Sequence, residues 1–227
     1  VLFLCRAHNG NLIDLIERHG FMVKTLPEGE VTDASVGYAS GPAHAAWLGC
    51  DWQSDAQQCH SILSGSTDWL IVDHYALDNR WESAMREKCH HIMCVDDLAD
   101  RTHDCDILLD QSLGRTADDY SHFVSSDTRL LLGPQYALLR CEFAQWRDIS
   151  LARRQSPKMH HILVTMGGVD YENVTGRVLA VLAQIRFATL RQITVVLGPH
   201  APWHDTVSAF AAGMKVRTTV LSNVENM

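Results

Sequence analysis

The stretch that most constrains the fold is residues 68–75, Asp-Trp-Leu-Ile-Val-Asp-His-Tyr. Its apolar run of four residues is too short for a helix and rich in strand-forming residues, which predicts a buried strand of a parallel sheet. Three polar side chains follow the run directly: Asp73, His74 and Tyr75. Because ligands of open α/β sheets bind beyond the carboxyl ends of the strands, we interpret these three as candidate site residues.

Short apolar runs of this kind recur along the chain and alternate with stretches of helical periodicity. The first example is a run at 1–5, an amphipathic stretch at 10–20 and a second run at 21–26. Repeats of this pattern predict an α/β fold with parallel sheets covered by helices on both faces. Further strands are expected at 92–95, 105–111, 130–134, 161–165, 193–197 and 216–221, and further helices at 79–90, 142–154, 173–185 and 203–212.

Two segments before residue 68 are less regular. Residues 27–42 are rich in Gly, Ser, Thr and Asp and lack periodicity, so we expect a long loop that either lines the site or is disordered. Residues 43–63 predict a helix that is broken near Gly49. Within it we interpret Trp47 and Trp52 as aromatic residues that fill the core.

The length of 227 residues suits two domains better than one. A polar stretch at 153–158 contains a proline and has no periodicity, which is typical of a linker. We therefore expect an N-terminal domain at 1–152 with about six strands, and a C-terminal domain at 159–227.

Composition and charge exclude several classes of protein. The chain is 46% hydrophobic, and no apolar run approaches the roughly 20 residues of a membrane span. No signal-peptide pattern opens it, so we predict a cytoplasmic protein without membrane association. Seven scattered cysteines, an odd number, indicate free thiols in a reducing compartment. The net charge of -8 and the lack of a basic stripe argue against a nucleic-acid partner, although helix N-termini can still hold a phosphate.

A glycine pair lies between a predicted strand and a predicted helix. Gly167 and Gly168 match the spacing of neither a Walker loop nor the dinucleotide fingerprint, which disfavours an NTPase or an NAD enzyme. The pair allows a ligand to approach the backbone, with Asp170 and Asn173 available as helix caps or ligand contacts. A plain tight turn with a cap is an equally good interpretation.

The sequence predicts neither a metal nor a cofactor. Cys89, His90 and His91, followed by Cys94, lack the paired spacing of zinc sites, and both histidines fall at the end of a predicted helix. The pair at 96–97 has ligands suited to Mg²⁺, but two acids entering a loop are more often caps or solvated charges.

No nucleophile motif is present, because the chain has no Gly-x-Ser-x-Gly elbow and no cysteine in a recognisable catalytic setting. His74 or Asp73 is placed to act as a general base, and Tyr75 to orient a hydroxyl or contact a phosphate. A histidine that merely satisfies a turn is a slightly better interpretation of His74 from the residues alone.

Several motifs together resemble one family. They are Val-Asp-His-Tyr at 72–75, the segments 96–101 and 103–106, Leu-Gly-Pro-Gln-Tyr-Ala-Leu-Leu-Arg at 132–140, and Gly-Gly-Val-Asp at 167–170 with Asn173. In this order they resemble the pseudaminic acid biosynthesis hydrolase family, whose members remove UDP from UDP-2,4-diacetamido-2,4,6-trideoxy-β-L-altropyranose. The similarity spans nearly the whole chain.

The resemblance implies a GT-B-like architecture, with two Rossmann-like domains related to MurG-type glycosyltransferases. It also implies metal-independent attack of water at the anomeric carbon, with inversion and release of UDP. In the family the base is a histidine in a Gly-x-Gly-His turn after the first strand, and this sequence has no such turn. Segment 1–5 matches the second strand of the family. We therefore expect both domains to be incomplete and the chain alone to be inactive.

Some site residues carry over by resemblance. Tyr75 matches the active-site tyrosine, and Asp73 and His74 are its neighbours. Gly167, Gly168, Asp170 and Asn173 fall on the nucleotide-sugar side of the second domain. The implied partner is a UDP-sugar, and a monomer is favoured. A UDP-sugar glycosyltransferase of the same fold and a non-catalytic nucleotide-sugar-binding module are the alternatives.

Overall fold

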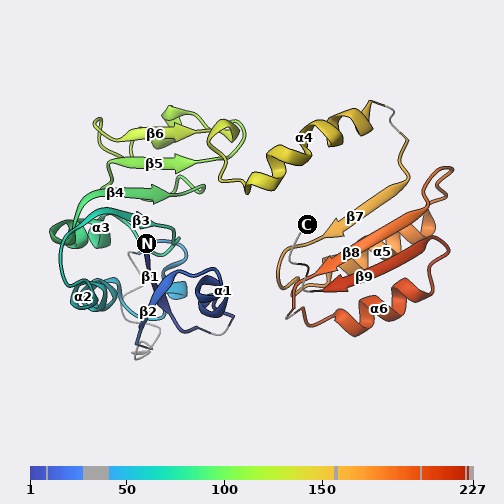
Figure 1. Ribbon diagram of the computed structural model, residues 1–227, viewed down its shortest axis with the longest axis horizontal. Helices are drawn as coiled ribbons and strands as arrows, with labels where there is room; N and C mark the ends of the chain where they lie inside the picture. Colours follow the sequence, from blue (N-terminus) through green and yellow to red (C-terminus); the bar gives the residue numbers. More distant parts are fainter. Residues whose placement is uncertain (9, 28–40, 156–157, 200, 223, 225–227) are drawn as a thin grey trace. The chain divides into compact units, whose positions relative to one another are not determined.

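The computed structural model describes all residues except 9, 28–40, 156–157, 200, 223 and 225–227. The chain forms two compact units, Val1–Arg140 and Cys141–Met227 (Figure 1). Every strand pair in both units is parallel, which confirms the predicted α/β class with parallel sheets. The predicted loop at 27–42 lies mostly outside the described residues.

Among its described residues the first unit contains six strands, where the sequence predicted about six. Its parallel sheets have the orders β1-β2 and β3-β4-β5-β6, and the second sheet can be followed in Figure 1. The elements in chain order are β1 (Leu2–Arg6), α1 (Ile13–Arg18), β2 (Met22–Leu26), η2 (Ala45–Leu48), α2 (Trp52–Ile62), β3 (Thr67–Val72), α3 (Asn79–Met85), η3 (Arg86–Lys88), β4 (Cys89–Val95), β5 (Ile107–Asp110), η4 (Ala117–Tyr120), β6 (Arg129–Leu132) and η5 (Pro134–Tyr136).

The strand register brings the candidate residues to one edge of the sheet. Val72, the last residue of β3, lies opposite Cys94 near the end of β4. The residues that follow these two parallel strands, 73–75 and 96–97, therefore leave the sheet on the same side. The predicted break of the 43–63 helix is also present, because Gly49 has a φ of 76° between η2 and α2.

The core of the first unit lies under α2 and α3. Met85, Ile92, Leu108 and Tyr120 are completely buried there. At the end of β1, the Arg6 guanidinium forms a buried ion pair with Asp55 of α2 (2.6 Å), which ties that strand to the helix layer.

The prediction that β3 is fully buried is wrong. Trp69 is 46% exposed and Ile71 is 63% exposed, whereas Val72 is buried. Successive side chains of a strand point to opposite faces, so one face of β3 meets the core and the other is left uncovered by the described residues. Among these residues β3 is also an edge strand of its sheet.

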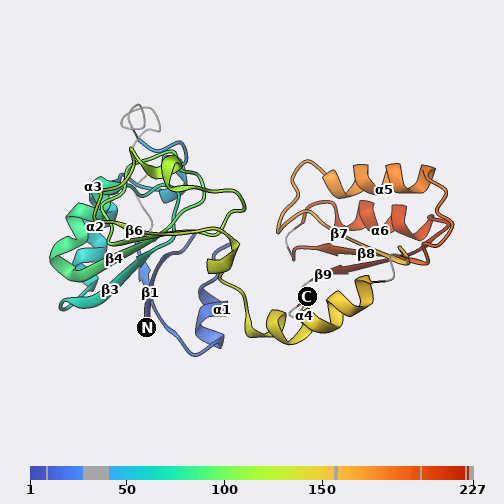
Figure 2. The same cartoon turned by 90° about the horizontal axis from the view of Figure 1, so that it is seen from above.

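The second unit is a three-stranded parallel sheet with two helices on one face. Its elements are α4 (Cys141–Arg154), β7 (His161–Thr165), α5 (Val174–Gln184), β8 (Gln192–Leu197), α6 (His204–Ala212) and β9 (Arg217–Ser222). Figure 2 shows α5 and α6 on the same side of the sheet. Leu179 of α5 and Val207 of α6 pack there against Ile193 and Val195 of β8.

The two units divide before α4, whereas the linker predicted at 153–158 begins within the last turn of that helix. No side chain of α4 is buried. Arg153 and Arg154 form its last turn, and residues 156 and 157 lie outside the described residues. The domain limits at 1–152 and 159–227 therefore stay a prediction.

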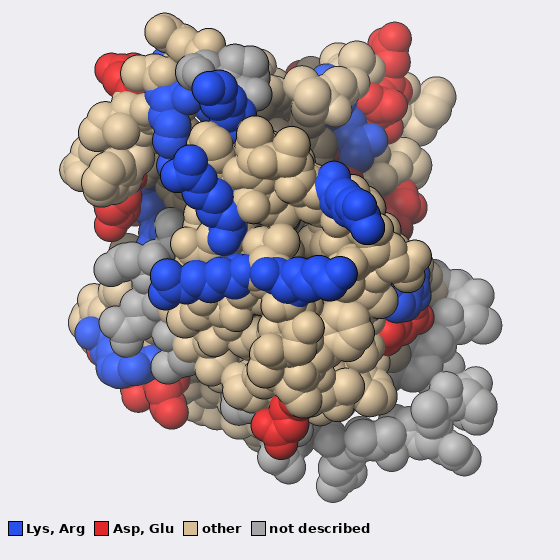
Figure 3. All heavy atoms as spheres, turned by 90° about the vertical axis from the view of Figure 1, so that its right-hand side faces the viewer, with Lys and Arg blue, Asp and Glu red and all other residues tan. Residues whose placement is uncertain are grey.

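Charge is divided unevenly between the units. The first unit holds 10 of the 19 Lys and Arg residues but 21 of the 27 Asp and Glu residues. The second unit therefore holds nine basic and six acidic residues, and basic side chains predominate on the face of it shown in Figure 3. The second unit thus has an excess of basic residues although the whole chain has a net charge of -8. None of the helices in the described residues is long and apolar enough to cross a bilayer.

Candidate functional site

The central contact of the candidate site joins the ends of β3 and β4. The Tyr75 hydroxyl donates a hydrogen bond to Asp97 Oδ1 at 2.7 Å. This bond, followed by burial, raises the pKa of Tyr75 to about 12, because the carboxylate stabilises the protonated phenol. Tyr75 is therefore neutral at physiological pH, and its single proton is committed to Asp97. Its oxygen can still accept a hydrogen bond from a ligand.

His74 is held in one tautomer by the backbone. The Ala76 N–H donates to His74 Nδ1 at 3.1 Å. Since an N–H can only donate, Nδ1 is unprotonated and the neutral ring carries its proton on Nε2. Burial lowers the pKa of His74, which favours this neutral form. Nε2 is thus a hydrogen-bond donor, which argues against His74 as a general base. Asp73 beside it is exposed.

A buried ion pair between Arg101 and Asp96 lies next to the Tyr75 ring. Arg101 Nη1 lies 2.7 Å from Asp96 Oδ1, and the guanidinium carbon is 5.9 Å from the centre of the Tyr75 ring. Burial on its own would raise the pKa of Asp96, but the Ala99 N–H and the Arg101 charge outweigh it and lower the pKa. Asp96 is therefore an internal counter-ion, and Asp97 alone faces solvent. This arrangement separates the two acids that the Mg²⁺ interpretation would require to act together.

The support continues into β5. Tyr120 Oη lies 2.9 Å from carboxylate oxygens of both Asp96 and Asp110, and Arg115 forms an ion pair with Asp110. Arg115 Nη2 also donates to the backbone carbonyl of Asp97 at 2.6 Å. Arg115 and Tyr120 were not among the residues predicted from the sequence. The signal available was a set of polar residues that follow β4 and β5, at the edge where Tyr75 lies.

Two aromatic residues from the η2 segment lie beside Tyr75. The His44 ring is centred 4.4 Å from Trp47 and 5.6 Å from Tyr75, and Trp47 is centred 6.0 Å from Tyr75. Trp47 is 58% exposed, so its interpretation as a core residue is wrong. The buried neighbour Leu48 anchors η2 instead. Trp52 is half-buried under the Arg80 guanidinium, at 5.5 Å.

The glycine turn of the second unit has its acidic and amide side chains turned toward helix α5. Asp170 accepts hydrogen bonds from the N–H groups of Val174 (2.8 Å) and Thr175 (2.9 Å), and Asn173 accepts one from Gly176 (3.0 Å). Burial opposes the charge of Asp170, but these bonds outweigh it and lower its pKa. Both residues therefore act as caps, and the first free amides of α5 are already satisfied.

The glycines themselves leave backbone accessible. Gly167 has a φ of 79°, and a Cβ added at Gly167 or Gly168 would meet no atom within 4 Å. On the other side the turn is tightly packed, because a Cβ at Gly198, after β8, would lie 1.7 Å from the Gly168 carbonyl oxygen. Gly198 is thus a further residue that shapes this turn. The strand-end breaker pair of Gly198 and Pro199 marked its position in the sequence.

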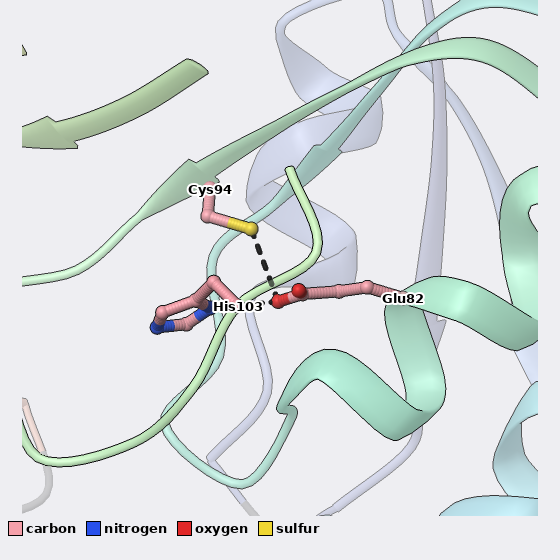
Figure 4. A group of neighbouring side chains, drawn as sticks. All are labelled: Glu82, Cys94 and His103. Atoms are coloured by element: carbon pink, nitrogen blue, oxygen red, sulfur yellow. Dashed lines mark hydrogen bonds and ion pairs between the residues drawn. The ribbon is translucent and has the colours of Figure 1, made fainter. Parts of the chain in front are cut away.

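One buried cluster has ligand types that metals use. Glu82 of α3, Cys94 of β4 and His103 converge in the core (Figure 4). Cys94 Sγ donates to Glu82 Oε1 at 3.1 Å, and His103 Nδ1 lies 2.8 Å from the same oxygen. A hydrogen bond with Cys105 and burial raise the pKa of the Cys94 thiol, which opposes the thiolate that a metal would need. The geometry is that of a hydrogen-bonded structural core.

The residues considered for zinc in the sequence do not converge. His90 and His91 lie in β4 and are exposed, whereas Cys89 and Cys94 are buried. The predicted helix end is therefore wrong: α3 stops at Met85, because the apolar side chains from Cys89 onward are needed in the sheet. His91 instead packs on Trp69, with ring centres 4.8 Å apart.

Comparison with known proteins gives distant relatives. No protein-family profile matches the chain. It is 30% identical over 122 residues to the UDP-2,4-diacetamido-2,4,6-trideoxy-β-L-altropyranose hydrolase of Campylobacter jejuni, a match that covers 53% of this chain and 42% of that protein. It is 26% identical over 174 residues to the uncharacterized protein MJ1062 of Methanocaldococcus jannaschii, which covers 74% and 35%. The chain thus spans less than half the length of these relatives.

Among solved structures, the crystal structure of Acinetobacter baumannii MurG aligns with a TM-score of 0.42 and 10% identity, over 100% of this chain and 67% of that one. The α/β class of the two units rests on their own strands and helices.

Proposed function

We propose that this chain is part of an enzyme that hydrolyses a UDP-sugar, with UDP-2,4-diacetamido-2,4,6-trideoxy-β-L-altropyranose as the substrate. The observation that carries the proposal is the Tyr75–Asp97 pair at the carboxyl ends of β3 and β4. Tyr75 is the last residue of the Asp-His-Tyr motif, which is one of the motifs on which the resemblance to the hydrolase family rests. The 30% identical relative, named for the same reaction, supports it.

In the proposed reaction the oxygen of water attacks the anomeric carbon. The bond between that carbon and the pyrophosphate oxygen breaks, its electron pair leaves with UDP, and a base takes the proton of water, with inversion. The resemblance assigns the base to a Gly-x-Gly-His turn that these 227 residues do not contain. His74 does not replace it, because its Nε2 is a donor. Metal independence and a place in pseudaminic acid biosynthesis are part of the proposal by resemblance.

The residues of this chain act as binding and orienting groups. Tyr75 accepts a hydrogen bond from a hydroxyl or acetamido N–H of the sugar, and His74 donates one through Nε2. The open backbone at Gly167 and Gly168 admits the nucleotide part, while Asp170 and Asn173 hold the turn in shape. A GT-B-like architecture, implied by the resemblance, a monomeric state and a cytoplasmic location belong to the same proposal.

The test uses the protein with all the sequence that its gene encodes, incubated with the UDP-sugar. We expect free UDP and free sugar without any acceptor, and NMR of the first-formed sugar should show the inverted anomer. Release that depends on an added acceptor would instead support a glycosyltransferase. Calorimetric binding of the UDP-sugar without turnover would support a binding module.

A variant at Tyr75 tests whether the hydroxyl of this residue contributes to turnover. Tyr75→Phe removes one hydrogen bond to the substrate, so we expect turnover to fall about three- to tenfold. Tyr136→Phe is the matched control, because Tyr136 is 40% exposed in η5 and makes no part of the proposed site. Equal activity of the two variants at equal stability would reduce Tyr75 to a packing residue.

A further inference from the structure

The rings of His44, Trp47 and Tyr75 form a contiguous group, here called the three-ring cluster. They come from two segments that are distant in the chain, the η2 turn and the connection after β3. Tyr75 is fixed within the cluster by Asp97 at its hydroxyl and by Arg101 near its ring. The cluster is thus a built surface at the edge of the sheet where ligands of α/β folds bind.

Trp47 is exposed although it contacts two other rings. Its 58% exposure means that much of the indole surface faces solvent, and exposing a large apolar surface is unfavourable unless something covers it. The η2 turn has other anchors beside this indole, namely the buried side chain of Leu48 and the contact of His8 Nε2 with the Leu48 carbonyl (3.3 Å).

The chemistry around the cluster suits a carbohydrate. An aromatic ring has a negative face that attracts polarised C–H groups, and a pyranose presents such C–H groups on one face and hydroxyl or amide groups at its rim. Tyr75 Oη and the exposed Asp97 carboxylate are polar groups available for that rim. This combination of an aromatic surface with a few placed polar groups is typical of small-molecule sites.

Charge favours the sugar over the pyrophosphate at this place. The first unit has 21 acidic and 10 basic residues, and Asp73 and Asp97 beside the cluster are both exposed. An excess of negative charge disfavours a pyrophosphate and leaves an uncharged group unaffected. A deoxygenated sugar with a methyl group adds apolar surface that fits the indole.

We propose that the three-ring cluster is the sugar subsite, with the Trp47 indole stacked on the C–H face of the pyranose. The proposal rests on the proposed function, because it takes the ligand to be a nucleotide sugar, and it assigns that ligand's uncharged half to residues that the sequence motifs do not include. The ring of the sugar is recognised at Trp47 and His44, and its polar rim at Tyr75.

The test compares two exposed tryptophans that each pack on a histidine. Trp47 lies 4.4 Å from His44, and Trp69 lies 4.8 Å from His91 on the outer face of β3 with 46% exposure. Calorimetry measures the affinity of each variant for the intact UDP-sugar and for UDP alone. We expect Trp47→Ala to weaken UDP-sugar binding about tenfold and to leave UDP binding unchanged. Trp69→Ala should change neither affinity.

Trp47→Phe keeps an aromatic face and should retain most of the affinity, which separates stacking from misfolding of η2. Circular dichroism of each variant checks the fold. Equal UDP-sugar affinity of Trp47→Ala and Trp69→Ala, in a protein that still releases UDP, overturns the subsite and leaves the proposed function intact. If Trp47→Ala weakens the binding of UDP as much as that of the UDP-sugar, the cluster contacts the uridine, and the sugar-subsite proposal is overturned. A wild-type protein that neither binds nor cleaves the UDP-sugar overturns both.

Discussion

The two units differ in what they expose at the carboxyl ends of their strands. In the first unit, the residues after β3 and β4 present side chains, and a buried ion pair between Arg101 and Asp96 holds them in place. In the second unit, the Asp170 and Asn173 side chains cap α5, and the backbone at Gly167 and Gly168 is left accessible. One unit presents polar side chains, and the other leaves open space beside the backbone of its glycine turn.

This difference matches the difference in charge. An acidic unit that presents a tyrosine, a histidine and exposed aromatic rings suits an uncharged group. The basic unit favours anions through its excess of Lys and Arg. The comparison also shows where each edge is vulnerable: the first depends on a buried charge, and the second on the absence of a side chain.

The largest expected effect comes from removing the support of the first edge. Arg101→Ala leaves the Asp96 carboxylate buried without its counter-ion, and such losses typically destabilise a protein by about 3–5 kcal/mol. Chemical denaturation measures the change in the free energy of unfolding. Arg147→Ala is the control, because its pair with Asp148 is exposed and 3.9 Å long, and it should cost about 0–1 kcal/mol. A loss below that of the control would show that the pair does not support this edge.

An intermediate effect is expected at the second edge. Gly198→Ala places a Cβ 1.7 Å from the Gly168 carbonyl oxygen, so the two loops must separate. We expect a loss of about 1–3 kcal/mol, the usual cost of overpacking, in thermal or chemical unfolding. Gly168→Ala is the control on the other side of the same contact, because its Cβ would meet no atom within 4 Å. If both variants are equally stable, the close approach of the two loops is not real.

The smallest effect is a pH dependence at the first edge. The pKa of Tyr75 is about 12 in the folded protein and about 10 in an unfolded chain, so the folded state holds this proton more tightly. The stabilisation is complete below pH 10 and is lost as the pH rises from about 10 to 12. The difference in tyrosinate absorbance between wild type and Tyr75→Phe reports this titration. Asp97→Asn should move it toward pH 10, and a wild-type titration already near 10 would contradict the Tyr75–Asp97 bond.

Much of the fold was predictable because strand and helix periodicity is a local property. The strand at 161–165 matches β7, and the break at Gly49 lies where the sequence places it. The burial of β3 was not predictable, because the apolar run at 69–72 does not reveal that one of its faces has no partner. The start of β4 at Cys89 was also missed, since helical and strand patterns overlap there.

The candidate site was predictable in position and less so in detail. Residues 73–75 could be found because they follow an apolar strand. Their partner Asp97 depends on the pairing of β3 with β4, which no local pattern specifies. The capping by Asp170 and Asn173 was one of the two interpretations open from the sequence, and the contacts support that one. Trp47 was misassigned, because a tryptophan in an apolar stretch has the same local signature whether it is buried or exposed.

The uncovered face of β3 has a consequence for how the protein behaves in solution. Trp69 and Ile71 project from a strand that forms an edge among the described residues, and an edge strand with exposed apolar side chains is a template for pairing with another chain. In the part of the chain that the structure describes, the strand that carries Tyr75 to its position is therefore also the one left open to such pairing. Replacing Ile71 with lysine would place a charge on this strand two residues before Asp73, without changing a side chain that the site uses.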